Sequence, residues 1–222
     1  TAASEGPVIP VSSSAPSSAP TVRTSVPGTR VILALDTSTD MLACAVARVT
    51  TASAQDNAAT TAIDVLATGD HLCRRRANVE LTATALETLA KAKLAMADVD
   101  QVLVGRGPGS FTGVRIGIAT AKGLACGLAT TLLGASTLDA VAWTAWQAGQ
   151  RGRLAVVGDA MRKEVYPGVY LLDERGAHRT FEVERVRTVN AAIDELKARS
   201  DAEQLVLSGD GLKKYRTAFE GA

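Results

Sequence analysis

The sequence predicts an α/β fold of two lobes, each with a mixed sheet flanked by helices. Hydrophobic residues fill 46% of the 222 positions and aromatic residues only 4%, so we expect an aliphatic core. Each half opens with an apolar strand that ends at or near an aspartate, 31–35 before Asp36 and 154–157 before Asp159. Strand–helix units follow in both halves, which favours a repeated architecture of sheets covered by helices.

The chain divides into three parts by composition. Residues 1–29 are rich in Ser, Ala and Pro and almost free of charge, so we expect a flexible tail outside the fold. The first lobe is expected over 30–137 and the second over 138–222, and the last helix could pack back on the first lobe.

Local patterns predict the individual elements. Up to residue 147 we expect strands at 31–35, 42–49, 62–68, 101–104 and 132–134, and helices at 78–96, 114–128 and 137–147. Beyond it we expect strands at 154–157, 165–172, 181–186 and 204–207, a helix at 191–199, and a last helix after 209–211. The first strand is apolar throughout, as in strands buried on both faces.

Charge and cysteine content exclude several protein classes. The net charge is +1, which argues against a surface that binds nucleic acid unaided. The three cysteines form no Cys-x-x-Cys pair, which is typical of a reducing cytosol and predicts a cytoplasmic protein. No apolar run is long enough to span a bilayer, and no secretory signal pattern is present.

Asp36 and the hydroxyls after it are the first candidate binding residues. A carboxylate at a strand end can hold a metal-bound water, and Thr37 and Ser38 could face phosphate oxygens. Equally, Asp36 could be a turn residue that accepts hydrogen bonds from its own backbone.

A glycine loop at 105–113 is the second candidate. It joins a strand to a helix, where free N–H groups and the helix dipole favour an anion, so Gly107 and Gly109 are candidate nucleotide-binding residues. The spacing matches neither GxGxxG nor a Walker loop. A tight turn that requires glycine for backbone reasons is the alternative.

Small residues recur along the helix that follows. Gly113, Gly117 and Ala121 form one row, and Gly123 and Gly127 form another. Rows of small side chains let another helix approach closely. That neighbour could lie within the lobe or in a partner subunit.

Catalytic groups are not evident. The two histidines, His71 and His178, are far apart and form no metal-binding motif with the cysteines, so no bound metal is expected. Ser110 is not in a Gly-x-Ser-x-Gly elbow, and Cys126 lies in the apolar helix, where a packing role is expected. We therefore predict no catalytic residue.

Several segments resemble the TsaB (YeaZ) family. They are 33–39 (LALDTST), 105–117 (GRGPGSFTGVRIG), 119–125 (ATAKGLA), 134–139 (GASTLD) and, with variations, 159–170 (DAMRKEVYPGVY). The resemblance runs from Val31 to about Gly211, and 105–139 is its most specific part. It implies a two-lobed actin/Hsp70-like (ASKHA) fold.

The resemblance also implies a function. Family members are non-catalytic partners of TsaD, a paralogue that forms N6-threonylcarbamoyladenosine in tRNA by transfer from the threonylcarbamoyl adenylate. The metal-binding His-x-x-x-His of TsaD falls at Thr137 and Val141 here, where no imidazole is present. The resemblance therefore implies a pseudo-enzyme.

The partners implied are TsaD, as a heterodimer, and the ATPase TsaE, with tRNA reached through the complex and a homodimer formed in isolation. The subunit contact uses the two long helices of the first lobe. Its implied interface residues here are Leu86, Leu89, Gly113, Val114, Gly117, Ile118, Ala121 and Leu124. No cofactor is expected to be tightly bound, and any ATP or ADP contact is expected to be weak and shared with TsaD.

Two other functions are weighed. A self-sufficient ATP-dependent phosphotransferase of the same fold would place Asp36 and Asp159 beside the phosphates, but no catalytic base stands out. A peptidase lacks both a metal site and a nucleophile–base pair. The family usually has a further C-terminal helical stretch, whereas this sequence ends at Ala222.

Overall fold

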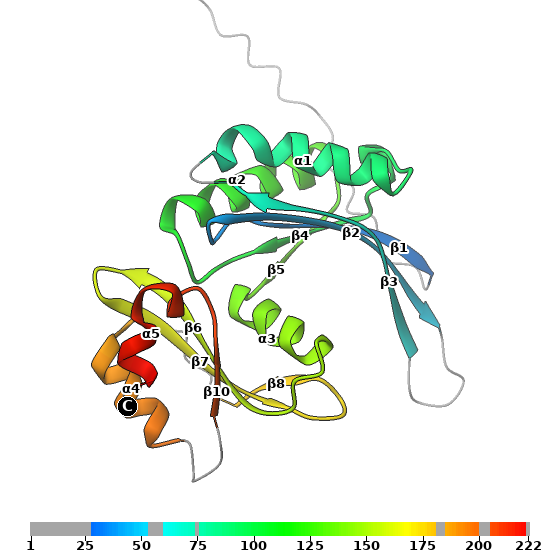
Figure 1. Cartoon of the computed structure of the whole chain (residues 1–222). Helices are drawn as coiled ribbons and strands as arrows, with labels where there is room; N and C mark the ends of the chain where they lie inside the picture. Colours follow the sequence, from blue (N-terminus) through cyan, green and yellow to red (C-terminus); the bar gives the residue numbers. More distant parts are fainter. Residues whose placement is uncertain (1–27, 53–59, 74–75, 181–184, 200–204, 221–222) are drawn as a thin grey trace, which may run out of the picture.

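The computed structural model describes residues 28–52, 60–73, 76–180, 185–199 and 205–220. These residues form two mixed sheets flanked by helices, as predicted, and each sheet has five strands (Figure 1). The strands of the first lobe are β1 (Thr29–Asp36), β2 (Met41–Ala52), β3 (Thr60–Leu72), β4 (Gln101–Gly105) and β5 (Thr131–Ala135). The helices up to residue 147 are α1 (Ala77–Lys91), the 3-10 turn η1 (Met96–Asp98), α2 (Phe111–Gly127) and α3 (Thr137–Gln147).

The remaining elements build the second lobe. Its strands are β6 (Gly152–Met161), β7 (Glu164–Leu172), β8 (Ala177–Arg179), β9 (Arg187–Thr188) and β10 (Leu205–Ser208). Its further helices are α4 (Val189–Lys197) and α5 (Leu212–Glu220). The expected strand at 181–186 falls mainly on residues outside the described ones.

The first sheet has the order β3-β2-β1-β4-β5. The β1–β2–β3 part is antiparallel, whereas β4 and β5 run parallel to β1. Helices α1 and α2 cover the face that points away from the second lobe (Figure 1). Alternate residues of β1, Leu33 and Leu35, are buried in the core beneath them. The intervening Ile32 and Ala34 are half-buried, so β1 is less enclosed than its continuous apolar run predicts.

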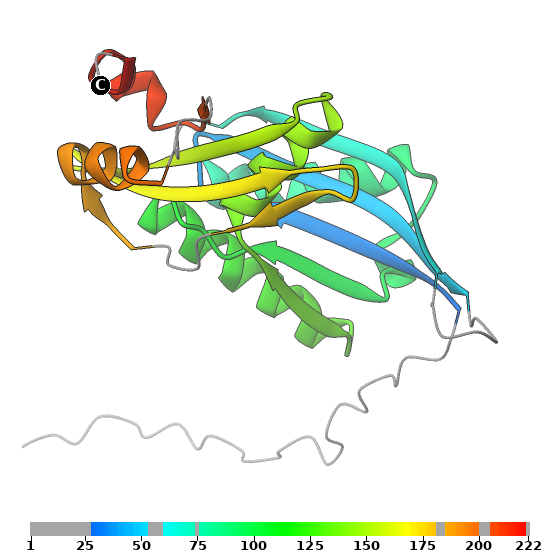
Figure 2. The same ribbon diagram turned by 90° about the horizontal axis from the view of Figure 1, so that it is seen from below.

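The second sheet has the order β10-β6-β7-β8, and β9 pairs with β7. Alternate residues of β6 point to opposite faces: Ala155 and Val157 pack with α4 and α5, and Leu154 and Val156 pack with α3. This strand is therefore buried on both faces, as its sequence predicts. Figure 2 shows α4 and α5 together at one side of the sheet.

One predicted detail of the helices is wrong. Helix α1 ends at Lys91 rather than near residue 96, because Lys93 adopts a left-handed conformation with φ 58°. Helix α5 packs through Phe219 into the core of the second sheet, beside α4.

None of the described helices combines the length and the apolar character needed to cross a membrane.

Candidate functional site

The parallel strands β1, β4 and β5 end at the same edge of the first sheet. Parallel strands deliver the residues after their carboxyl ends to one place, and this edge is where ligands usually bind in open α/β sheets. Here it gathers Asp36, the glycine loop 105–110 that follows β4, and Thr137 at the start of α3.

The Asp36 carboxylate accepts hydrogen bonds from Ser38, which is nearby in sequence, and from a residue of α3. Its Oδ1 accepts hydrogen bonds from the Ser38 amide at 2.7 Å and the Ser38 hydroxyl at 2.6 Å. Its Oδ2 accepts from Thr137 Oγ1 at 2.8 Å, and the Ser38 and Thr137 hydroxyl oxygens lie 2.9 Å apart. The Asp36 turn therefore satisfies its own carboxylate and links it to α3.

The glycine loop lies directly against this turn. A Cβ built on Gly109 would lie 2.2 Å from the Ser38 carbonyl oxygen, so a larger residue would collide with backbone. Ser110 N–H donates to that same oxygen at 2.6 Å, and Gly107 accepts from the Thr137 amide at 2.8 Å. These contacts give the glycines a packing role.

The five candidate nucleotide-binding residues, Asp36, Thr37, Ser38, Gly107 and Gly109, therefore come together at one edge. Thr37 and Ser38 are buried, and Thr37 Oγ1 donates to the Gly113 carbonyl at 2.7 Å. Their hydroxyls serve contacts within the protein.

The second lobe has a corresponding aspartate. Asp159 forms an ion pair with Lys214 of α5, and its amide donates to Asp210 Oδ1 at 2.9 Å. Burial raises the pKa of Asp210 above its usual value. A positively charged side chain of the same lobe therefore already neutralises Asp159.

The row of small residues Gly113, Gly117 and Ala121 faces inward. A Cβ on Gly113 would lie 2.0 Å from the Thr37 carbonyl oxygen, and one on Gly117 would lie 2.6 Å from Thr37 Oγ1. Ala121 is fully buried. This row lets α2 lie close to the end of β1, so it packs within the lobe.

This packing corrects the predicted partner interface. Leu89, Gly113, Gly117 and Ala121 are buried in the first lobe, and the others apart from Leu86 are half-buried: Val114, Ile118 and Leu124. Leu86 is the exposed member of the set, at 50%. The sequence did not show which side of each helix meets the sheet.

Both helices present another face to solvent. Exposed apolar or small residues follow one side of each helix, and we refer to them together as the outer face: Val79, Ala83, Leu86 and Ala90 on α1, and Phe111, Ala119, Gly123, Cys126 and Gly127 on α2. On α1 these residues recur every three or four positions and form one helical stripe. On α2 Phe111 lies eight positions before Ala119, and the exposed Arg115 and Lys122 lie among the small residues of the same side. A Cβ on Gly123 or Gly127 would have no neighbour within 4 Å.

A cavity of about 330 Å³ opens beside the Asp36 turn, between the β1–β2 connection and the starts of α1 and α2. Its lining residues include Thr37, Asp40, Met41, Cys73 and Thr112. It is separate from Asp36 itself, whose carboxylate does not line it.

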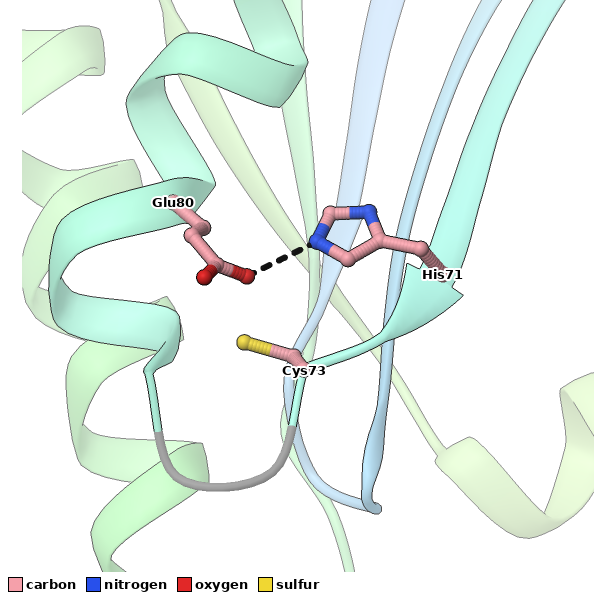
Figure 3. A group of neighbouring side chains, drawn as sticks. All are labelled: His71, Cys73 and Glu80. Carbon is pink, nitrogen blue, oxygen red and sulfur yellow. Dashed lines mark hydrogen bonds and ion pairs between the residues drawn. The ribbon is translucent and has the colours of Figure 1, made fainter.

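Next to this cavity the structure assembles a group that sequence reasoning missed. His71, Cys73 and Glu80 point toward one another at the junction of β3 and α1 (Figure 3). His71 Nε2 lies 2.9 Å from Glu80 Oε2. Burial raises the pKa of the Cys73 thiol, and the hydrogen bond with His71 lowers that of Glu80. The expected strand ended at residue 68, whereas β3 continues to Leu72 and brings His71 to the start of α1.

Comparison with known proteins decides the family. A family model described as TsaD, tRNA N6-adenosine threonylcarbamoyltransferase, matches residues 71–217. The tRNA threonylcarbamoyladenosine biosynthesis protein TsaB of Escherichia coli is 38% identical over 115 residues, 52% of this chain and 50% of that protein. TsaB of Buchnera aphidicola is 28% identical over 186 residues, 84% of this chain and 81% of the relative. The chain belongs to the TsaD-type family and, within it, to the TsaB (YeaZ) branch.

Solved structures agree with this TsaB assignment. YeaZ from Pseudomonas aeruginosa superposes with a TM-score of 0.62 at 29% identity, covering 85% of this chain and 79% of that one. A second structure, described as an uncharacterised protein with similarity to peptidase YeaZ from the same organism, gives 0.65 at 28% identity with the same coverage. The chain thus has the ASKHA-like arrangement of two mixed sheets flanked by helices.

Proposed function

We propose that this chain is a non-catalytic subunit that binds a TsaD-type enzyme during formation of N6-threonylcarbamoyladenosine in tRNA. Relatives named as TsaB biosynthesis proteins and the match to the TsaD family model support this role. The matched segment spans half the length of the Escherichia coli relative, so activity and partners are part of the proposal. In it, the chain supports transfer from the threonylcarbamoyl adenylate, and TsaE and tRNA join through the complex.

The observation that carries the proposal is the outer face of α1 and α2. Val79, Leu86 and Phe111 are 64%, 50% and 75% exposed on adjacent helices, and an apolar surface of this kind favours a protein partner. Gly123 and Gly127 leave open backbone on which a partner helix could settle closely. A TsaD-type paralogue of related fold would carry a matching pair of helices.

The proposed lack of catalysis rests on the junction between the lobes. The positions that carry imidazoles in TsaD are Thr137 and Val141 here. Thr137 donates to Asp36, and Val141 packs against the core of the second lobe. A hydroxyl and an isopropyl group cannot replace two imidazoles as ligands of a divalent metal.

We propose that any nucleotide contact of this chain is weak and is completed by the partner. The Asp36 carboxylate and the Thr37 and Ser38 hydroxyls already have internal partners, so a phosphate would have to displace them. The pairing of Asp159 with Lys214 argues in the same direction for the second lobe, and against a self-sufficient phosphotransferase.

Calorimetric titration with the TsaD-type protein of the same organism tests the interface. Ala83→Glu places a charge at the centre of the outer face and is expected to weaken the complex at least about tenfold, because binding would bury an unpaired carboxylate. Ala191→Glu, at an exposed position of α4, is the matched control and should bind like the wild type. Equal binding of both variants would refute the outer face as the interface.

A further inference from the structure

His71, Cys73 and Glu80 place three different metal-binding groups in one small volume. Their donor atoms all lie within 4.8 Å of one another. His71 is in the last residues of β3, Cys73 follows the strand directly, and Glu80 lies in the first turn of α1, with the three side chains pointing toward one another (Figure 3). The cluster is outside the junction of Asp36 and Thr137 and apart from the outer face.

The chemistry of these donors selects a class of cation. An imidazole nitrogen, a thiolate and a carboxylate are the ligand types of zinc sites, whereas magnesium and calcium take oxygen ligands. A thiolate and a carboxylate together balance the charge of a divalent ion. Three protein ligands also leave one position of a tetrahedral ion for water.

We propose that His71 Nε2, Cys73 Sγ and a carboxylate oxygen of Glu80 bind one zinc-type divalent ion at the junction of β3 and α1. Zinc bonds to these ligand types measure roughly 2.0–2.3 Å, so the ligand atoms around a tetrahedral zinc ion lie about 3.5 Å from one another. The observed spread of up to 4.8 Å therefore requires modest closure, and the 2.9 Å contact of His71 with Glu80 must open to admit the ion.

Binding exchanges protons for the ion in a balanced way. The S–H bond of Cys73 breaks, its proton goes to the solvent, and the sulfur electron pair bonds to the metal. The proton that His71 Nε2 donates to Glu80 moves through solvent to Nδ1, so that Nε2 can give its lone pair to the metal, and Glu80 Oε2 exchanges its hydrogen bond for the metal. Arg76 Nε stays 2.9 Å from Glu80 Oε1 and continues to orient the carboxylate.

Access and protection differ among the three ligands. The His71 side chain is 42% exposed, so an ion can enter from its side, while Cys73 is only 5% exposed. Cys73 also lines the 330 Å³ cavity beside the Asp36 turn, which leaves room for the fourth ligand. The bound ion would tie β3 to the first turn of α1, from which the outer face begins.

The competing account is that these side chains form a hydrogen-bond network and bind no ion. Cobalt(II) titration of the metal-free full chain, with zinc competition and elemental analysis, distinguishes the two. We expect one cobalt per chain, a thiolate-to-cobalt absorption band that zinc removes, and a higher Tm with zinc. No band and no bound metal in the wild type would overturn the proposal.

Three variants test which residues bind the ion. Cys73→Ser should abolish the band, and His71→Gln should weaken cobalt binding at least about tenfold. Cys126→Ser removes an exposed thiol outside the cluster and should leave both band and affinity unchanged. His71 is partly exposed, so His71→Gln keeps the test decisive if Cys73→Ser does not fold. A band that survives in His71→Gln with full affinity, or is lost in Cys126→Ser, would contradict the site.

Discussion

Thr137 Oγ1 donates a 2.8 Å hydrogen bond to Asp36 Oδ2, which joins the first turn of α3 to the end of β1 across 101 positions of sequence. Helix α3, which packs on the second sheet, is thereby hydrogen-bonded to the first sheet. Thr137 therefore has a structural role: its hydrogen bond to Asp36 joins the two lobes.

Thr137→Val should lower the free energy of unfolding by about 1–3 kcal/mol, because it leaves a carboxylate oxygen of Asp36 without its donor while keeping the side-chain shape. Urea unfolding measures the change. Thr144→Val removes an exposed hydroxyl of the same helix, which donates only to the Ala140 carbonyl, and should change stability by less than about 0.5 kcal/mol. Equal effects of the two variants would show that the Asp36 contact contributes nothing.

Gly117→Ala and Gly123→Ala should have opposite signs although both lie in α2. The first places a methyl group 2.6 Å from the buried Thr37 hydroxyl and should destabilise by about 1–3 kcal/mol. The second meets no neighbour within 4 Å and should stabilise by up to about 1 kcal/mol through helix propensity. Thermal and urea unfolding of the pair check this, and stabilisation by Gly117→Ala would disprove the inward packing of that row.

The pKa of Asp210, raised by burial, predicts a pH-dependent effect of Asp210→Asn. Because the folded pKa is above the unfolded one, ionising Asp210 costs stability as pH rises from about 3.8 through the folded value, and the full cost is present at neutral pH. Asparagine keeps the acceptor for the Asp159 amide without the charge. The variant should therefore be more stable than the wild type at pH 7, with an advantage that vanishes in acid.

Unfolding curves for Asp210→Asn at several pH values test this sign. Asp194→Asn, at an exposed position of α4, is the control and should give a difference that stays small throughout. An advantage of Asp210→Asn that grows as the pH falls would contradict the expected linkage.

The outer face should make the isolated chain self-associate. Leu86→Glu is expected to shift the dimer toward monomer by at least about tenfold in Kd, because it places a charge on an apolar surface that the dimer would bury. Leu171→Glu changes a comparably exposed leucine on the second sheet and should leave the dimer intact. Light scattering after size-exclusion chromatography, over a range of concentrations, measures the oligomeric state of both variants. A dimer that persists in Leu86→Glu would place the contact elsewhere.

Sequence patterns predicted what local chemistry determines. The apolar run before Asp36 and the polar turn after it predict the β1–β2 hairpin, and the glycines at 105–113 mark the junction of β4 with α2. The helical spacing of apolar residues also predicted the long helices, although α1 ends earlier than expected.

Features of the fold that depend on tertiary contacts could not be predicted from the sequence. Both sides of α2 carry small residues, and only the position of the Thr37 carbonyl decides that Gly113 rather than Gly123 faces the sheet. His71 and Glu80 meet because β3 runs four residues beyond its apolar pattern, to Leu72. A histidine two positions before a cysteine, shortly ahead of a helix with an acidic first turn, is the signal that could have shown the cluster.

Reconstituted threonylcarbamoyl transfer to tRNA tests the central claim most directly. The chain alone, supplied with the threonylcarbamoyl adenylate and tRNA, is expected to form no modified adenosine, and adding the TsaD-type protein and TsaE should restore formation. Ala83→Glu should lower the rate of the restored reaction, whereas Ala191→Glu should not. Modified tRNA formed by this chain without a second subunit would contradict the account.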